Sequence, residues 1–206
     1  VIQDARKLSG FDRIESKGSV DLVLRQAATE SVTVVTDSNI APFVITTVEN
    51  GKLIINAKGS WSSRSNVKVL VDVVNLSSVA LSGSGDVSGR GLNLKQFAVS
   101  ISGSGDARFE ELNTETLSAS ISGSGDFFAT GKAPNQSYSI AGSGDIRTDG
   151  LEGSNVSVSI AGSGDAKIWA TQNIDVAIAG SGDVRYRGTP TNVKKRVAGS
   201  GSVSQM

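Results

Sequence analysis

The sequence lacks cysteine and histidine altogether. Without cysteine there is no disulfide framework, no thiolate metal site and no cysteine nucleophile. Without histidine the commonest general base and the usual zinc ligand are missing as well. A catalytic pair of carboxylates would need a cleft, and no irregular, acid-rich insertion offers one. We therefore expect a protein that is not an enzyme and that carries no cofactor.

Charge of one sign is not in excess, because 20 Lys and Arg balance 20 Asp and Glu. A neutral chain has no overall field that would attract nucleic acid or an anionic membrane. No run approaches the roughly 18 apolar residues of a transmembrane helix. The sequence opens on Val1 without a signal segment, and we expect the mature form of an exported protein.

Glycine, by contrast, is abundant, and much of it lies in one repeated element. Gly-Ser-Gly-Asp occurs at intervals of 18 to 20 residues, and Gly-Ser-Gly-Ser closes the series at 199–202. A fixed period of this length indicates a repeat architecture. The repeated glycines and aspartates are Gly83, Gly85, Asp86, Gly103, Gly105, Asp106, Gly123, Gly125, Asp126, Gly142, Gly144, Asp145, Gly162, Gly164, Asp165, Gly180, Gly182 and Asp183.

The residues around each element alternate in polarity. The position two before the first glycine is apolar in every copy, from Leu81 to Val197, and the residue after each Asp is apolar too. Alternation with period 2 predicts a strand on either side of each element, with one buried face. The whole chain is then all-β: a parallel solenoid of about ten coils, each about 20 residues long, with identical positions stacked in ladders.

We interpret the Gly-Ser-Gly-Asp elements as structural corners. Glycine permits positive φ angles and close approach where corners stack on corners. Stacked carboxylates about 5 Å apart would repel by roughly 1 kcal/mol per pair in water. We expect hydrogen bonds to backbone N–H groups and a ladder of Arg108, Arg147, Lys167 and Arg185 to offset this repulsion. Calcium on the aspartates is the functional alternative, although the nine-residue period and paired glycines of calcium-binding β-rolls are absent.

The first 80 residues are rich in β-forming runs but lack the repeated element. Strands are expected at 20–24, 32–36, 43–48, 52–57 and 67–74, with a tight turn at 49–52. We assign residues 1–80 to irregular coils and a cap around Phe11 and Ile14, and residues 81–206 to regular coils of the same single domain, 1–206. A separate small β domain is the alternative for the first part.

Three further features bear on binding. Trp61, in a polar loop at 58–66, and Trp169, predicted to point outward, are the candidates for contact with a sugar or a protein. Tyr186 is expected in the core. Lys194, Lys195 and Arg196 charge the last strand, which discourages pairing with other chains; a basic binding patch is the alternative.

The serial "SGSGD" and "AGSGD" corners, each preceded by an apolar residue and a small one, and the segment "FDRIESKGSVDLVL" resemble the putative auto-transporter adhesin, head GIN domain family. The resemblance covers residues 11–203. It implies a right-handed, single-stranded parallel β-helix of pectin-lyase-like shape without the catalytic residues of those enzymes. It also implies export to the cell surface, the outer membrane, the periplasm or the extracellular space, and a role in adhesion.

Together these observations predict a non-catalytic, adhesin-like or structural β-helix that presents repetitive flat faces to a glycan or a protein. The alternative is a carbohydrate-binding or carbohydrate-processing β-helix, which a groove lined by Trp169 or by clustered Asp and Lys would favour. Neither nucleic acid nor a membrane span is expected. Self-association, the ligand and the mode of anchoring stay open.

Overall fold

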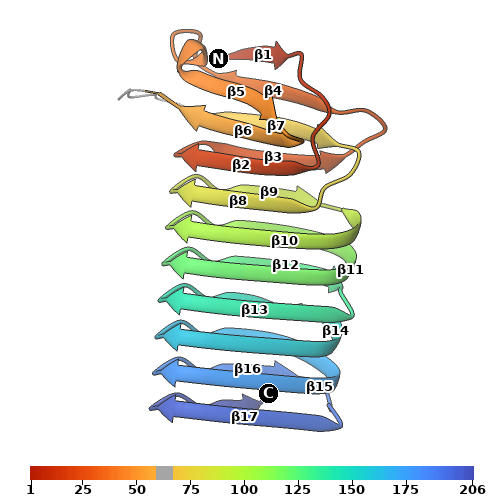
Figure 1. Cartoon of the computed structure of the whole chain (residues 1–206), viewed down its shortest axis with the longest axis vertical. Helices are drawn as coiled ribbons and strands as arrows, with labels where there is room; N and C mark the ends of the chain where they lie inside the picture. Colours follow the sequence, from red (N-terminus) through yellow and green to blue (C-terminus); the bar gives the residue numbers. More distant parts are fainter. Residues whose placement is uncertain (59–66) are drawn as a thin grey trace.

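The computed structural model describes residues 1–58 and 67–206, and its strands wind into one tall solenoid (Figure 1). The N-terminal elements are β1 (Ile2–Arg6), β2 (Arg13–Gly18), β3 (Asp21–Gln26), β4 (Ser31–Thr36), the 3-10 helix η1 (Ala41–Phe43), β5 (Val44–Glu49), β6 (Lys52–Ala57) and β7 (Lys68–Val73). The repeated part comprises β8 (Ser78–Gly83), β9 (Val87–Arg90), β10 (Asn93–Gly103), β11 (Ala107–Gly123), β12 (Phe127–Lys132), β13 (Asn135–Gly142), β14 (Ile146–Gly162), β15 (Ala166–Gly180), β16 (Val184–Arg187), β17 (Asn192–Gly199) and β18 (Val203–Gln205).

Each regular coil contributes one strand to a front face and one to a rear face. The front face consists of β6, β2, β8, β10, β13, β17 and the second halves of β11, β14 and β15; the rear face consists of β7, β3, β9, β12, β16, β18 and the first halves of the same three long strands. In Figure 1 the front strands run to the left and the rear strands to the right as the chain descends, which is a right-handed coil. The predicted right-handed parallel β-helix is therefore confirmed.

The core lies between the two faces, where the inward residues of successive coils stack in register. Ile101 pairs with Leu81 on one side and with Ile121 on the other, and all three are at most 3% exposed. Aromatic rings fill the wider part of the core, and the Phe97 and Phe109 rings meet edge to face at 5.0 Å between centroids. The alternation read from the sequence thus places the apolar residues on the buried side, as predicted.

The N-terminal residues depart from the expected succession of coils. β2 pairs in parallel with both β6 and β8, so the first coil in the sequence lies between coils formed later. β4 pairs antiparallel with β1 and β7, and β5 forms an antiparallel hairpin with β6 through the predicted turn, where Asn50 and Gly51 both have positive φ. The solenoid has about six regular turns rather than ten because these residues form hairpins and stack out of order.

The predicted positions of the cap were also wrong. Phe11 and Ile14 are buried inside the stack, at 2% and 1% exposure, since β6 and β8 cover β2 on both sides. The elements that cover the end of the stack are instead β1, β4, β5 and η1, at the top of Figure 1, where β4 pairs with β7 and β5 pairs with β6.

At the opposite end, β17 pairs with β15 alone among the described strands. Its inward column is consequently open to solvent, and Val197 is 44% exposed although the sequence pattern predicts burial. Lys195 shields part of this end, because its Nζ donates to the carbonyl of Val203 at 3.0 Å and lies 5.6 Å from the ring centroid of Tyr186. Tyr186 is only 8% exposed, as expected for a core residue.

Candidate functional site

The Gly-Ser-Gly-Asp elements form one continuous edge of the solenoid, with each corner directly on the one before it. Gly123 pairs in register with Gly103 and has a φ of +134°, and a Cβ there would lie 2.3 Å from the Gly103 carbonyl oxygen. A Cβ on Gly125 would lie 2.1 Å from the Gly105 oxygen. Neither glycine leaves room for a side chain at this edge, which is packed backbone against backbone.

The aspartates of this edge bind the backbone of the next coil. The Oδ1 atom of Asp106 accepts the Asp126 N–H at 2.8 Å, and the same bond recurs along the edge from Asp86 to Asp183, where the Ser202 N–H is the donor. These bonds give the corner N–H groups an acceptor. Each of these carboxylates is therefore hydrogen-bonded to the backbone of the next coil rather than to the backbone of its own turn.

The basic ladder contributes less to this edge than predicted. Arg147 lies 3.2 Å from Asp145 and 3.6 Å from Asp126, whereas Arg108 pairs with Glu110 and stacks on Phe128. Lys167 and Arg185 come within 4.0 Å of no carboxylate in the described parts of the chain. The expected pairing of acidic and basic ladders is thus restricted to Arg147. No cluster suited to a metal ion occurs among the described residues.

One corner that precedes the repeated series was not predicted from the sequence. Gly18-Ser19-Val20-Asp21 occupies the corner position of the β2–β3 coil, since Gly18 pairs with Gly83 and the Asp21 Oδ1 accepts the Asp86 N–H. Only the third residue departs from the repeated pattern, and Gly-Ser-x-Asp would have identified this corner in the sequence.

The rear face carries a groove of about 290 Å³ lined by alternating acids and bases: Asp145, Arg147, Asp165, Lys167, Asp183 and Arg185, with Ile146 and Ala166. Trp169 lies next along β15, but it is half-buried rather than exposed, because the Arg187 guanidinium stacks 4.3 Å from its ring centroid. The predicted outward Trp is therefore partly covered. Trp61 falls outside the described residues.

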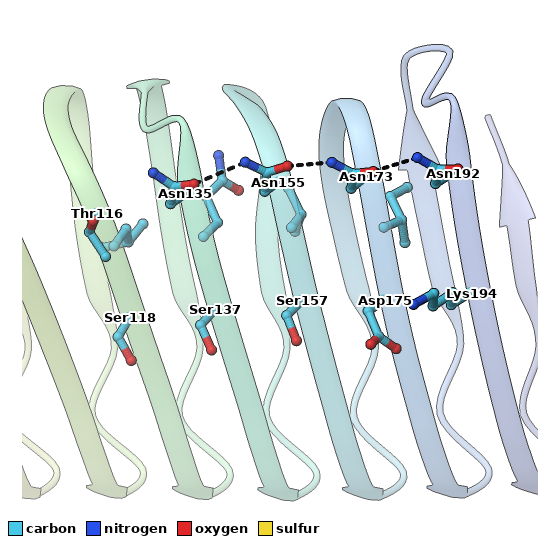
Figure 2. Close-up of a pocket in the computed structure, with 14 residues that line it drawn as sticks. Thr116, Ser118, Asn135, Ser137, Asn155, Ser157, Asn173, Asp175, Asn192 and Lys194 are labelled. Carbon is cyan, nitrogen blue, oxygen red and sulfur yellow. Dashed lines mark hydrogen bonds between the residues drawn. The ribbon is translucent and has the colours of Figure 1, made fainter.

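A groove of about 590 Å³ lies on the front face and is shown in Figure 2. We call it the amide groove, after the four asparagines on its border. Nδ2 of Asn155 donates to Oδ1 of Asn135 at 3.0 Å, Asn173 donates to Asn155 at 2.6 Å, and Asn192 donates to Asn173 at 2.8 Å. A second row of Ser118, Ser137, Ser157, Asp175 and Lys194 runs parallel to these asparagines.

Sequence reasoning overlooked the amide groove, although a signal was present. Asn135, Asn155, Asn173 and Asn192 recur with nearly the period of the corners. They lie where each coil begins its strand on the front face, and alternation places their side chains outward. The apolar columns alone do not reveal them.

Five ionisable groups among the described residues have clearly shifted pKa values. Two of them are Arg90, whose pKa is raised, and Glu111, whose pKa is lowered, each by the hydrogen bond and the charge of the other. The pKa of Glu15 is lowered by hydrogen bonds from Lys52, at 2.7 Å, and from Lys17. The pKa of Asp183 is lowered by the Ser202 hydroxyl and N–H. Burial raises the pKa of Tyr138, whose hydroxyl donates to Gln136 in the core. The charge of Arg185, which lines the rear groove together with Asp183, is a smaller cause of the Asp183 shift.

Neither groove contains a histidine or a cysteine, because the sequence has none. What both grooves offer is a row of outward polar groups repeated at the strand spacing on a stack of hydrogen-bonded coils. This fold and these surfaces define a right-handed β-helix with repeating polar faces. No helix in the described ranges is long and apolar enough to cross a membrane.

Comparison with known proteins identifies the family. Residues 10–190 match the model of the family described as "Putative auto-transporter adhesin, head GIN domain", and the chain belongs to that family. No curated protein matches the sequence. Several solved structures share the fold along the whole chain, and three of them are described below.

The first of these structures is a putative adhesin from Bacteroides fragilis, with a TM-score of 0.94 and 23% identity over 100% of this chain and 96% of that one. A second, from Parabacteroides distasonis, is named a putative lipid binding protein and has a TM-score of 0.78 and 26% identity over 100% and 96% of the two chains. A putative adhesin from Parabacteroides merdae has a TM-score of 0.71 and 24% identity, covering 100% and 95%.

Proposed function

We propose that the protein is a non-catalytic, adhesin-like module that binds a surface ligand, a glycan or a protein, through its repetitive faces. One observation carries the proposal: outward side chains repeat in register from coil to coil, as in the aligned asparagines of the amide groove. Individually weak contacts repeated on a rigid support add up when they engage together. Membership in a family described as adhesins supports this role.

The test compares the protein in monomeric form with the same protein coupled at high density to beads. Both are applied to cell surfaces, immobilised glycans and lipid vesicles, the last because one structural relative is named a putative lipid binding protein. Retention that rises at least 100-fold on the beads agrees with the proposal, since avidity gains of this size need no new contact. Absence of retention on every surface, or release of sugar products from a polysaccharide, would contradict it.

A carbohydrate-binding or carbohydrate-processing β-helix is the second candidate. It is favoured by the rear groove, where three acids alternate with three bases beside the half-buried Trp169. An aromatic ring next to charged and polar groups is suited to stacking on a sugar. A glycan array probed with the wild type and with Trp169→Ala separates the possibilities: loss of a glycan signal in the variant places the sugar on the rear face.

We further propose that residues 1–206 form a single domain exported to the cell surface, the periplasm or the medium. All the described strands belong to one hydrogen-bonded sheet, which supports one cooperative unit. A single coincident unfolding transition by circular dichroism and fluorescence is expected, and two separated transitions would favour an independent N-terminal domain. Cell fractionation and protease accessibility in whole cells test the location, and light scattering tests self-association.

A further inference from the structure

We propose that the amide groove binds a neutral glycan chain bearing N-acetyl groups, laid along the solenoid axis. This inference rests on the proposed adhesive function and specifies its ligand and its site. The front groove differs from the rear groove in the chemistry of its border, where the four aligned asparagines replace acids and bases.

The hydrogen bonds between the asparagines leave a defined set of free groups. A carboxamide has two N–H donors and two acceptor lone pairs. Within the ladder, Asn155 and Asn173 each use one donor and one acceptor on their neighbours. Each therefore retains one N–H and one lone pair, and both side chains are exposed. An N-acetyl group presents one C=O and one N–H, which is the complementary pair.

The distribution of charge restricts the class of ligand. Between Thr116 and Ser157 the groove is lined by hydroxyl, amide and apolar groups, and charge appears only at its C-terminal side, on Asp175 and Lys194. Asp175 is engaged by Arg196 at 2.8 Å. A polyanion or a polycation would find no counter-charges along most of the groove, whereas a neutral chain with hydroxyl and amide groups would be matched.

The spacing favours a glycan over a peptide. Adjacent coils are about 4.8 Å apart, so the three steps from Asn135 to Asn192 span about 14 Å. An extended peptide advances only about 3.3 Å per residue, and its amides fall out of step with the asparagines after one coil. In a β-1,4-linked chain alternate hexose units turn their N-acetyl groups to the same side, so these groups would meet every second asparagine of the row. Ser118, Ser137 and Ser157 lie parallel to the asparagines, where the sugar hydroxyls would hydrogen-bond.

The test measures binding of the β-1,4-linked tetramer of N-acetylglucosamine by titration calorimetry or by array. The matched probe is the β-1,4-linked glucose tetramer, which lacks the N-acetyl groups, and the acetylated amide of tetra-alanine serves as the peptide probe. We expect the glucose tetramer to bind about tenfold more weakly, because two hydrogen bonds of about 0.7 kcal/mol each would be lost.

Substitution of the asparagines would also weaken coil stacking, so the blocking variant is Ser157→Arg, which fills the groove and leaves the asparagines intact. Its control is Ser100→Arg, an exposed serine on the same face in β10, with the same change in charge. We expect Ser157→Arg to reduce affinity for the acetylated tetramer at least tenfold and Ser100→Arg to change it less than twofold. Equal unfolding midpoints would show that both variants are folded.

Four outcomes would overturn the inference and leave the adhesive function standing. Equal binding of the acetylated and glucose tetramers would remove the role of the amides. Binding that survives Ser157→Arg but is lost in Trp169→Ala would place the sugar on the rear face. Preference for the peptide, or retention of the beads on cells without binding to the acetylated tetramer, would identify another ligand. Failure of retention on every surface would instead refute the adhesive function itself.

Discussion

Replacing Gly125 by alanine should disrupt the stack more than any ordinary surface substitution. The new Cβ would lie 2.1 Å from the Gly105 carbonyl oxygen and 2.9 Å from the Ile101 Cγ2, whereas ordinary contacts between non-bonded heavy atoms are about 3.5 Å. Both obstacles belong to the preceding coil, so the two corners must separate by roughly 1 Å. Overpacking of this kind costs about 1–3 kcal/mol.

Separation would also weaken bonds between the coils. The Ser124 and Gly125 N–H groups both donate to the Gly103 oxygen, at 2.9 and 3.2 Å. If each weakened bond costs about 1 kcal/mol, the free energy of unfolding falls by about 3–5 kcal/mol in total. For a chain of this size that corresponds to a drop of roughly 6–20 °C in Tm.

The assay is denaturant unfolding followed by circular dichroism, with Gly91→Ala as the control. Gly91 has a φ of +68° and nothing within 4 Å of an added Cβ, so alanine there meets only the backbone penalty of about 1–2 kcal/mol. If Gly125→Ala were no more destabilising than Gly91→Ala, close packing of the corners would not be the reason for the repeated glycines.

Three further predictions concern polar groups. Asp126→Asn should leave the free energy of unfolding within about 0.5 kcal/mol of the wild type, because the amide oxygen still accepts the backbone N–H of the next coil. Asp126→Ala should lower it by about 1–2 kcal/mol in denaturant unfolding. Equal losses in the two variants would refute the role of Asp126 as an acceptor. Tyr138→Phe should cost about 1–3 kcal/mol by leaving the buried Gln136 Oε1 without its donor, and the double variant with Gln136→Leu should recover part of this loss in the same assay. The pKa of Glu15 is lowered in the folded protein. Its contribution to stability is therefore present above its ordinary pKa and is lost as the pH falls through the folded value. Lys52→Met should flatten the acid limb of a plot of Tm against pH, and an unchanged limb would contradict this.

The sequence predicts the regular coils well because their information is local and repeated. The strands expected at 32–36 and 52–57 begin and end within a residue of β4 and β6, and the corners align as the period requires. The order of the N-terminal coils is a different kind of property. The order depends on which strands pair with β2, whereas the alternation of polarity within β2 predicts only which of its side chains face inward.

The candidate sites likewise combine features that the sequence predicts with contacts that it does not predict. Alternation identifies outward positions such as Trp169, but it does not reveal that Arg187 from the next coil covers the ring. It also does not reveal that carboxylates bind the N–H of the following corner rather than neighbouring cations. Such contacts join residues about one period apart, and they become visible in a sequence only when equal positions of successive coils are compared. The series from Asn135 to Asn192 is visible in that comparison.

The position of the β2–β3 coil has a consequence for how the molecule forms as the chain emerges from the ribosome or from an export channel. Its partners on either side, β6 with β7 and β8 with β9, are synthesised after it. One edge of the β2–β3 coil therefore stays unpaired until residue 73 has emerged, and the other until residue 90. Ordered winding can then proceed in one direction, towards β17, each new turn using the completed one as its template. A chaperone that holds the first 90 residues extended would delay the whole process, whereas one acting on later turns would delay only their addition.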